Sequence, residues 1–140
     1  MLISWDAFER LDFNPGDRSP IYADFSPGRP LTGSVTTRDG RHLAGRVVYD
    51  LDESETTETL DAPSQGVDYT LPFGLIASIA LTDGKDSAVV TLYTGEKLQL
   101  ERRGDLSERN GGLLIFREGV SQPEYVIWSN VERIDFDRPR

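Results

Sequence analysis

Acidic side chains are concentrated in one short stretch of this sequence, and this stretch is the first candidate for a functional site. The order Asp50-x-Asp52-x-Ser54-x-Thr56-x-Glu58-x-x-Asp61 is close to that of the oxygen ligands of a calcium loop. Such a loop needs Gly where Glu55 stands, and helices on both sides. We therefore favour a solvated acidic loop, and keep Ca²⁺ or small-ligand binding at residues 50–61 as an alternative. The acidic residues of this stretch are Asp50, Asp52, Glu53, Glu55, Glu58 and Asp61.

The sequence offers few candidate residues for nucleophilic or redox chemistry. The chain has no Cys, which excludes disulfides, thiol nucleophiles, Cys-ligated zinc and iron–sulfur clusters. Its single His, His42, precedes Leu43 and is expected on the face away from the core, with no motif to supply a nucleophile or an orienting partner. Ser34, Ser78 and Ser129 lie in no Gly-x-Ser-x-Gly frame. We expect no catalytic, cofactor-binding or metal-ligating residues and a non-enzymatic role.

Charge and hydropathy indicate the kind of partner. The 140 residues include 24 acidic and 15 basic side chains, a net charge of −9, which opposes nonspecific binding to nucleic acid. Arg102-Arg103 is the only basic pair, and no apolar run is long enough to span a membrane. The N-terminus lacks the basic start of a signal peptide, so the sequence as it stands reads as cytoplasmic, or as exported if a leader was removed. We expect a protein partner or self-association, no nucleic acid and no membrane.

The composition favours short strands joined by turns. Hydrophobic residues make up 37% of the chain, with 13 Gly and 8 Pro. Half of the prolines fall in residues 14–33, which predicts an extended linker. Asp39-Gly40 and, further on, Thr94-Gly95 each separate two apolar-rich runs, and this pattern predicts two β-hairpins.

An internal repeat organises the rest of the chain. With a shift of 55 positions, residues 35–81 align with residues 90–136 without a gap, and 8 of the 47 positions are identical. The identities fall on a turn glycine, on loop acids and on apolar strand positions. The identical pairs are Val35/Val90, Thr36/Thr91, Gly40/Gly95, Leu43/Leu98, Asp50/Asp105, Leu51/Leu106, Glu53/Glu108 and Ile79/Ile134.

A third copy of the closing part of the repeat stands at the N-terminus. Residues 5–13 match residues 128–136 at five of nine positions, and residues 73–81 fill the same frame. The shared spacing predicts a strand that ends at the aromatic residue, one 3₁₀ turn, and a second strand that leaves at an angle. The fixed place of Trp5, Phe73 and Trp128 in this frame predicts core packing rather than stacking on a sugar or base.

These patterns predict an all-β fold of two tandem five-stranded barrels. The expected divisions are a partial repeat at 1–13, the linker at 14–33, one barrel at 34–82 and a second at 87–137. Residues 34–81 carry eight acidic and three basic side chains, a net −5 of the total of −9. We therefore expect the partner surface on the acidic side of the first barrel.

Residues 35–50 resemble the first motif of Sm-like barrels. That motif has a strand, Asp-Gly, an apolar residue, a Gly and an apolar strand ending in Asp, here Asp39-Gly40, Leu43, Gly45 and Asp50. The resemblance implies a small SH3-like or Sm-like barrel, and an Sm-like nucleic-acid binder as a second alternative function. The second Sm motif, an apolar strand followed by Arg-Gly, is absent, as is the Asn that contacts RNA. The repeat pattern is also similar to repeat domains of uncharacterised bacterial proteins, which implies no function.

Removal of residues 1–13 tests whether the partial repeat docks on the rest of the protein. Because a docked strand contributes hydrogen bonds and apolar contacts, we expect the deletion to lower the melting temperature or to change the oligomeric state. Thermal unfolding and light scattering measure the two quantities. An unchanged melting temperature together with an unchanged mass would contradict docking.

Overall fold

The computed structural model describes residues 2–7, 9, 10, 12, 27–82 and 86–138, and their regular structure is β-strand with short 3₁₀ turns. The predicted all-β class is confirmed. The expected linker falls largely outside the described residues, as do parts of the second strand expected in residues 9–13. Among the described residues, no helix has the length and apolar character needed to cross a membrane.

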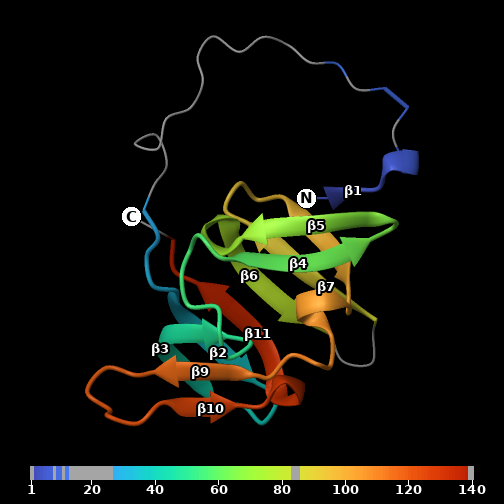
Figure 1. Cartoon of the computed structure of the whole chain (residues 1–140). Coiled ribbons are helices and arrows are strands. Elements are labelled where there is room, and N and C mark those ends of the chain that lie inside the picture. The colour runs from blue at the N-terminus through green and yellow to red at the C-terminus, as the bar shows by residue number, and fades with distance from the viewer. Residues whose placement is uncertain (1, 8, 11, 13–26, 83–85, 139–140) are drawn as a thin grey trace.

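Eleven strands follow one another along the described chain (Figure 1). The first half holds β1 (Leu2–Ile3), β2 (Thr32–Thr37), β3 (His42–Tyr49), β4 (Thr59–Ser64), β5 (Val67–Pro72) and β6 (Ile76–Leu81). The second half holds β7 (Ser87–Leu92), β8 (Lys97–Glu101), β9 (Leu113–Phe116), β10 (Glu124–Val126) and β11 (Val131–Phe136). The 3₁₀ turns are η1 (Trp5–Ala7), η3 (Phe73–Leu75), η4 (Gly104–Leu106) and η5 (Trp128–Asn130).

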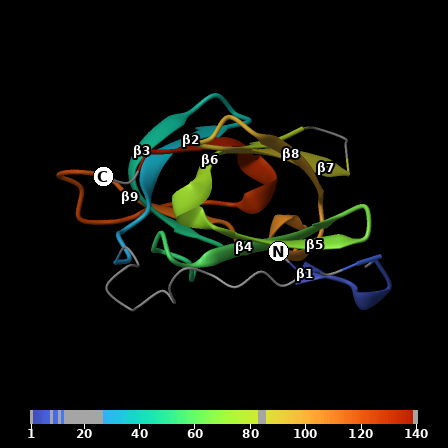
Figure 2. The ribbon, with the colours of Figure 1, turned by 90° about the horizontal axis from the view of Figure 1, so that it is seen from above.

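The strands form two antiparallel sheets that mix both halves of the sequence. The larger sheet has the order β10-β9-β3-β2-β11-β6-β7-β8, and the smaller has the order β1-β5-β4. β11, the last strand, therefore lies between β2 and β6 of the first half. Seen from above, the small sheet lies across the interior that the curved large sheet surrounds (Figure 2).

Both predicted hairpins form, and their registers correspond. Gly40 and Gly95 have φ of 89° and 91°, a conformation that glycine adopts without strain, so each sits at a tight turn. Val35 pairs with Leu43 in the first hairpin, and the corresponding Val90 pairs with Leu98 in the second. Alternate residues of β2 and β7 are buried, and Val35 and Val90 are fully enclosed. Period-two burial of apolar residues thus selects strands here.

The two strands that follow the 3₁₀ turns pair with each other at the centre of the large sheet. Ile79 of β6 faces Ile134 of β11, and these are equivalent positions of the 55-residue alignment. On their other flanks, β6 pairs with β7 and β11 pairs with β2. Both of these ladders contain a register shift, between Ile76 and Ser78 in one and between Val131 and Arg133 in the other. The pairing is therefore symmetric about the Ile79–Ile134 contact.

The prediction of closed barrels is wrong. β3 continues to Tyr49 and pairs with β9, whereas β8 ends at Glu101 and forms no ladder with β4 in the described chain. The chain turns instead into η4, where Gly104 has a φ of 58° and its backbone lies against the carbonyl of Asp61. A side chain at Gly104 would clash with that carbonyl, so the close approach requires glycine. The strand pairing also crosses the expected division at residues 82–87.

The predicted 3₁₀ turns are confirmed in all three copies of the closing element. Each begins at its aromatic residue: Trp5 in η1, Phe73 in η3 and Trp128 in η5. The predicted core role of Phe73 and Trp128 is also confirmed, because both are buried. The ring of Tyr49 joins them, with centroids 5.1 Å from Phe73 and 5.6 Å from Trp128. The aromatic cluster thus contains residues from both halves of the chain.

The ungapped alignment fails in the loops. Leu51 and Leu106 are identical in the alignment, yet Leu51 is 46% exposed and Leu106 is fully buried. The buried residues of β4 and β9 match at a shift of 53 rather than 55, since Leu60 corresponds to Leu113. The hairpins and the β6/β11 strands therefore follow the alignment, and the segments between them do not.

A cut between β6 and β7 tests the interlocked pairing. We would insert a protease site between Leu81 and Ser87 and cleave the folded protein there, at a connection that lies outside the ladders. Because β2 pairs with β11 and β3 pairs with β9, we expect the two fragments to elute together from a size-exclusion column. Elution as two separate fragments without denaturant would show that the halves fold independently.

Candidate functional site

The acidic stretch begins with a tight turn at the end of β3. The N–H of Glu53 donates to the carbonyl of Tyr49 at 2.9 Å, and the N–H of Tyr49 donates to the carbonyl of Glu53 at 2.7 Å. Asp50 and Leu51 adopt φ of 51° and 67°. A left-handed conformation costs a non-glycine residue about 1–2 kcal/mol, so surrounding contacts must hold this turn.

Side-chain oxygens of the acidic stretch accept backbone hydrogen bonds that hold it in place. Asp50 Oδ1 accepts the N–H of Gly111, which ties the turn to the loop before β9. Glu58 Oε2 accepts the N–H groups of Ser54 and Glu55 at 2.6 and 2.9 Å. Charge-assisted bonds of this kind are stronger than neutral ones. Some carboxylates of the acidic stretch therefore stabilise the local fold.

Asp105 performs the same task from the second half of the chain. Its Oδ2 accepts the N–H of Asp61 at 2.6 Å, and its carbonyl accepts hydrogen bonds from Tyr49 Oη at 2.7 Å and Asn110 Nδ2 at 2.9 Å. Burial raises the pKa of the Asp105 carboxyl, and the neighbouring acidic charges of Asp61 and Asp50 raise it further. The acidic stretch and the loop of Asp105 thus form one polar junction between the halves.

Three carboxylates of this junction can converge on one point. Asp50, Asp52 and Glu53 each offer an oxygen, and these oxygens lie within 4.8 Å of one another. Burial raises the pKa of Glu53 to about 8, and the hydrogen bond with Asp52 and the charge of that residue add to the effect. At neutral pH the pair Asp52–Glu53 therefore holds a proton. Binding of Ca²⁺ or a small ligand by residues 50–61 stays a prediction from the sequence.

Two other features singled out in the sequence are His42 and the basic pair Arg102-Arg103, which directly precedes the loop of Asp105. His42 is exposed, as predicted, and its Nδ1 lies 3.2 Å from the hydroxyl of Thr36. Arg102 donates to the carbonyl of Leu106, and Arg103 pairs with Glu101 at 3.4 Å.

An edge strand of the large sheet carries apolar side chains that the sequence reasoning did not single out. β10 stands at the end of the strand order, and Tyr125 and the adjoining Ile127 are 52% and 56% exposed. Val120, in the loop before β10, is 49% exposed. The Tyr125 hydroxyl donates to the carbonyl of Gly111 at 2.8 Å, which fixes the ring against the sheet. The signal was present as an aromatic-apolar run, but the sequence did not show that this strand is an edge.

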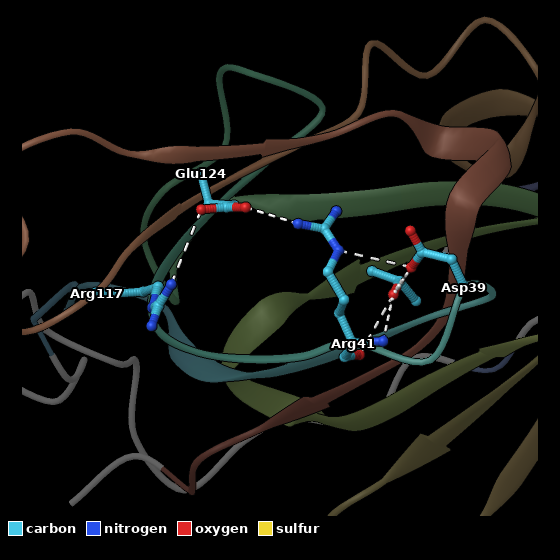
Figure 3. A network of polar contacts seen from close by, with 5 residues as sticks. Asp39, Arg41, Arg117 and Glu124 are labelled. Atoms are coloured by element: carbon cyan, nitrogen blue, oxygen red, sulfur yellow. Dashed lines mark hydrogen bonds and ion pairs between the residues drawn. The ribbon is translucent and has the colours of Figure 1, made fainter.

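Ion pairs anchor the first residue of β10 (Figure 3). Arg41 Nη1, in the β2–β3 turn, donates to Glu124 Oε1 at 2.6 Å, and Arg117 Nη1 lies 3.9 Å from Glu124 Oε2. Arg41 Nε also lies 3.6 Å from Asp39. Each exposed pair contributes only about 0.2–1 kcal/mol, but together they connect the turn of one hairpin to the edge strand of another.

Comparison with known proteins gives no further assignment. No protein-family model, no curated protein and no solved structure matches the chain.

The raised pKa of Glu53 predicts a stability that falls as pH rises. Between its ordinary pKa of 4.5 and the folded value of about 8, the unfolded chain loses this proton while the folded protein keeps it. Stability is therefore lost progressively across that window. Glu53→Gln cannot ionise, so we expect it to melt about 2–6 °C above the wild type at pH 8 and level with it at pH 4.5.

Thermal unfolding across this pH range measures the effect, and Glu55→Gln is the matched control at an exposed carboxyl of the same loop. An equal difference between wild type and Glu53→Gln at every pH would show that Glu53 ionises normally.

Proposed function

We propose that this chain is a non-enzymatic interaction and assembly module, and that it self-associates by pairing the β10 edges of two copies. The observation that carries the proposal is the exposure of Tyr125 in the edge strand β10 and of Ile127 directly after it, where ion pairs at Glu124 hold the strand in position. An edge strand presents unpaired backbone N–H and C=O groups, and added strands satisfy them. Exposed apolar side chains beside such an edge give the contact a hydrophobic contribution.

We infer a duplicated small SH3-like or Sm-like fold whose copies have exchanged strands and do not close into two barrels. In this interpretation, β2 and β3 of the first copy combine with β9, β10 and β11 of the second, and β7 and β8 combine with β4, β5 and β6. Matching registers support it: Gly33 pairs with Gly45 as Ala88 pairs with Leu100. β5 and β10 then hold corresponding places, each directly before a 3₁₀ turn.

The chain already adds a strand at one of these two corresponding edges. Leu2 pairs with Asp68 and Ile3 pairs with Val67, so β1 covers the outer edge of β5. The outer edge of β10 has no such strand among the described residues. A strand added at β10 would cover the second edge in the way that β1 covers the outer edge of β5.

A second copy fits the β10 edge better than it fits the opposite end of the sheet. Antiparallel pairing of two β10 strands about Tyr125 and Val126 places Glu124 opposite Ile127 of the other copy, so like charges do not face each other. β8, at the other end, exposes Lys97 and Gln99, polar side chains of the kind that protect an edge from pairing. The net charge of −9 also favours a protein partner over a nucleic acid.

Ile127→Glu tests the proposal. A charge at this position opposes Glu124 across the pairing and removes apolar contact area, so we expect the dimer to dissociate at least about tenfold more readily. Sedimentation equilibrium up to about 100 µM protein measures the association, and circular dichroism verifies the fold.

Leu75→Glu is the matched control, because Leu75 is a similarly exposed apolar residue in η3, outside the β10 edge. A wild-type protein that stays monomeric throughout this range would overturn self-association. Equal dimerisation of Ile127→Glu and wild type would place the contact elsewhere.

A further inference from the structure

A cavity of about 670 Å³ opens where the start of β2 runs beside the end of β11. The N–H of Asp137 donates to the carbonyl of Thr32 at 2.8 Å and joins the two segments. Thr56 closes a third side, because its N–H donates to the carbonyl of Arg29 at 2.8 Å and its hydroxyl accepts the N–H of Arg29 at 3.0 Å. The walls thus come from three parts of the chain that are cross-linked by backbone hydrogen bonds.

The floor of the cavity is apolar. Leu31, Phe73 and Phe136 line it, and each is buried in the core. The two phenylalanine rings meet edge to face with centroids 5.8 Å apart. Ring edges carry a partial positive charge, so such a floor suits a flat apolar group.

The rim carries two arginines in a strongly acidic protein. Arg29 and Arg138 line the cavity together with Asp137, which gives the rim a net charge of +1 while the whole chain carries −9. The Arg138 guanidinium lies 5.9 Å above the ring of Tyr93, and the Tyr93 hydroxyl donates to the carbonyl of Phe136 at 2.8 Å. Tyr93 thus connects this cation to the backbone at the floor of the cavity.

We propose that this cavity binds a small organic anion with a flat apolar body and a carboxylate or similar group. The volume lies within the range of about 300–1,000 Å³ that is typical of small-molecule sites. The apolar body would lie over Phe73 and Phe136, and the anionic group would lie between Arg29 and Arg138, where a guanidinium can bind a carboxylate with two parallel hydrogen bonds. No residue of the β10 edge lines the cavity, so this proposal is independent of self-association.

The site differs from the small-ligand alternative at residues 50–61. That alternative places the ligand among carboxylates, which suits a cation. Here Thr56 is the one residue of the acidic stretch that lines the cavity. The charged groups on the rim favour an anionic ligand.

The test is a titration of the full chain with 1-naphthoate, in which calorimetry measures the affinity and amide chemical shifts locate the binding site. We expect sub-millimolar binding, with shifts that centre on Leu31, Thr32, Thr56 and Arg138. 1-Naphthalenemethanol, which has the same ring system without the charge, should bind at least tenfold more weakly. The double variant Arg29→Gln/Arg138→Gln should lose the same factor for naphthoate and little for the neutral analogue.

Arg109→Gln is the control for overall charge, because Arg109 is exposed and does not line the cavity. It should bind naphthoate as the wild type does. Absence of binding at millimolar naphthoate would overturn the proposal. So would equal binding of the neutral analogue, an equal loss in Arg109→Gln, or shifts that centre outside the cavity. Unchanged sedimentation in the double variant would separate this result from the test of self-association.

Discussion

The pairing of β6 with β11 is the contact on which the rest of the molecule depends. Ile79 and Ile134 face each other in the middle of the large sheet, and both are completely buried. Full burial of such a side chain contributes about 1.5–3 kcal/mol. Each strand uses its other flank to bind the first hairpin of the opposite half. If this central pair were lost, the two hairpins would have no common support.

A second layer of contacts depends on that central pairing. The 3₁₀ turns that precede β6 and β11 bring Phe73 and Trp128 into contact with the ring of Tyr49. The Tyr49 hydroxyl donates to the carbonyl of Asp105, so a ring at the end of β3 is fixed by a loop of the other half. Burial and the nearby acidic charge of Asp105 raise the pKa of Tyr49, so the phenol remains a hydrogen-bond donor. The same junction encloses Glu53, whose retained proton follows from a fold that places acidic residues of both halves side by side.

The sequence predicted those parts of the fold that are decided locally. A glycine at each tight turn, alternating apolar residues and the aromatic frame were sufficient to predict the hairpins and the 3₁₀ turns. Pairing between distant strands could not be predicted in the same way. Ile79 and Ile134 lie in apolar strands of similar pattern, so either strand could pair with β2 or with β7. The exposed edge at Tyr125 and the cavity above Phe136 both follow from that choice of partner, and for this reason neither was identified in the sequence. The raised pKa of Glu53 was missed because it depends on the burial of a turn. The residues with a left-handed conformation in that turn are Asp50 and Leu51, and neither is a glycine that would have indicated the turn.

The short connection between β6 and β7 explains which partner each strand takes. β6 ends at Leu81 and β7 begins at Ser87, and the two strands pair antiparallel from Leu81 with Ala88 onward. Closing a loop this short costs little conformational entropy, so the local hairpin forms in preference to a pairing of β6 with the distant β2. Once β7 is paired with β6 on one side and with β8 on the other, β7 has no free edge with which β11 could pair. β2 still has an open edge of matching register, and β11 takes it. The pairing of strands from the first half with strands from the second half in the large sheet therefore follows from the short connection between β6 and β7.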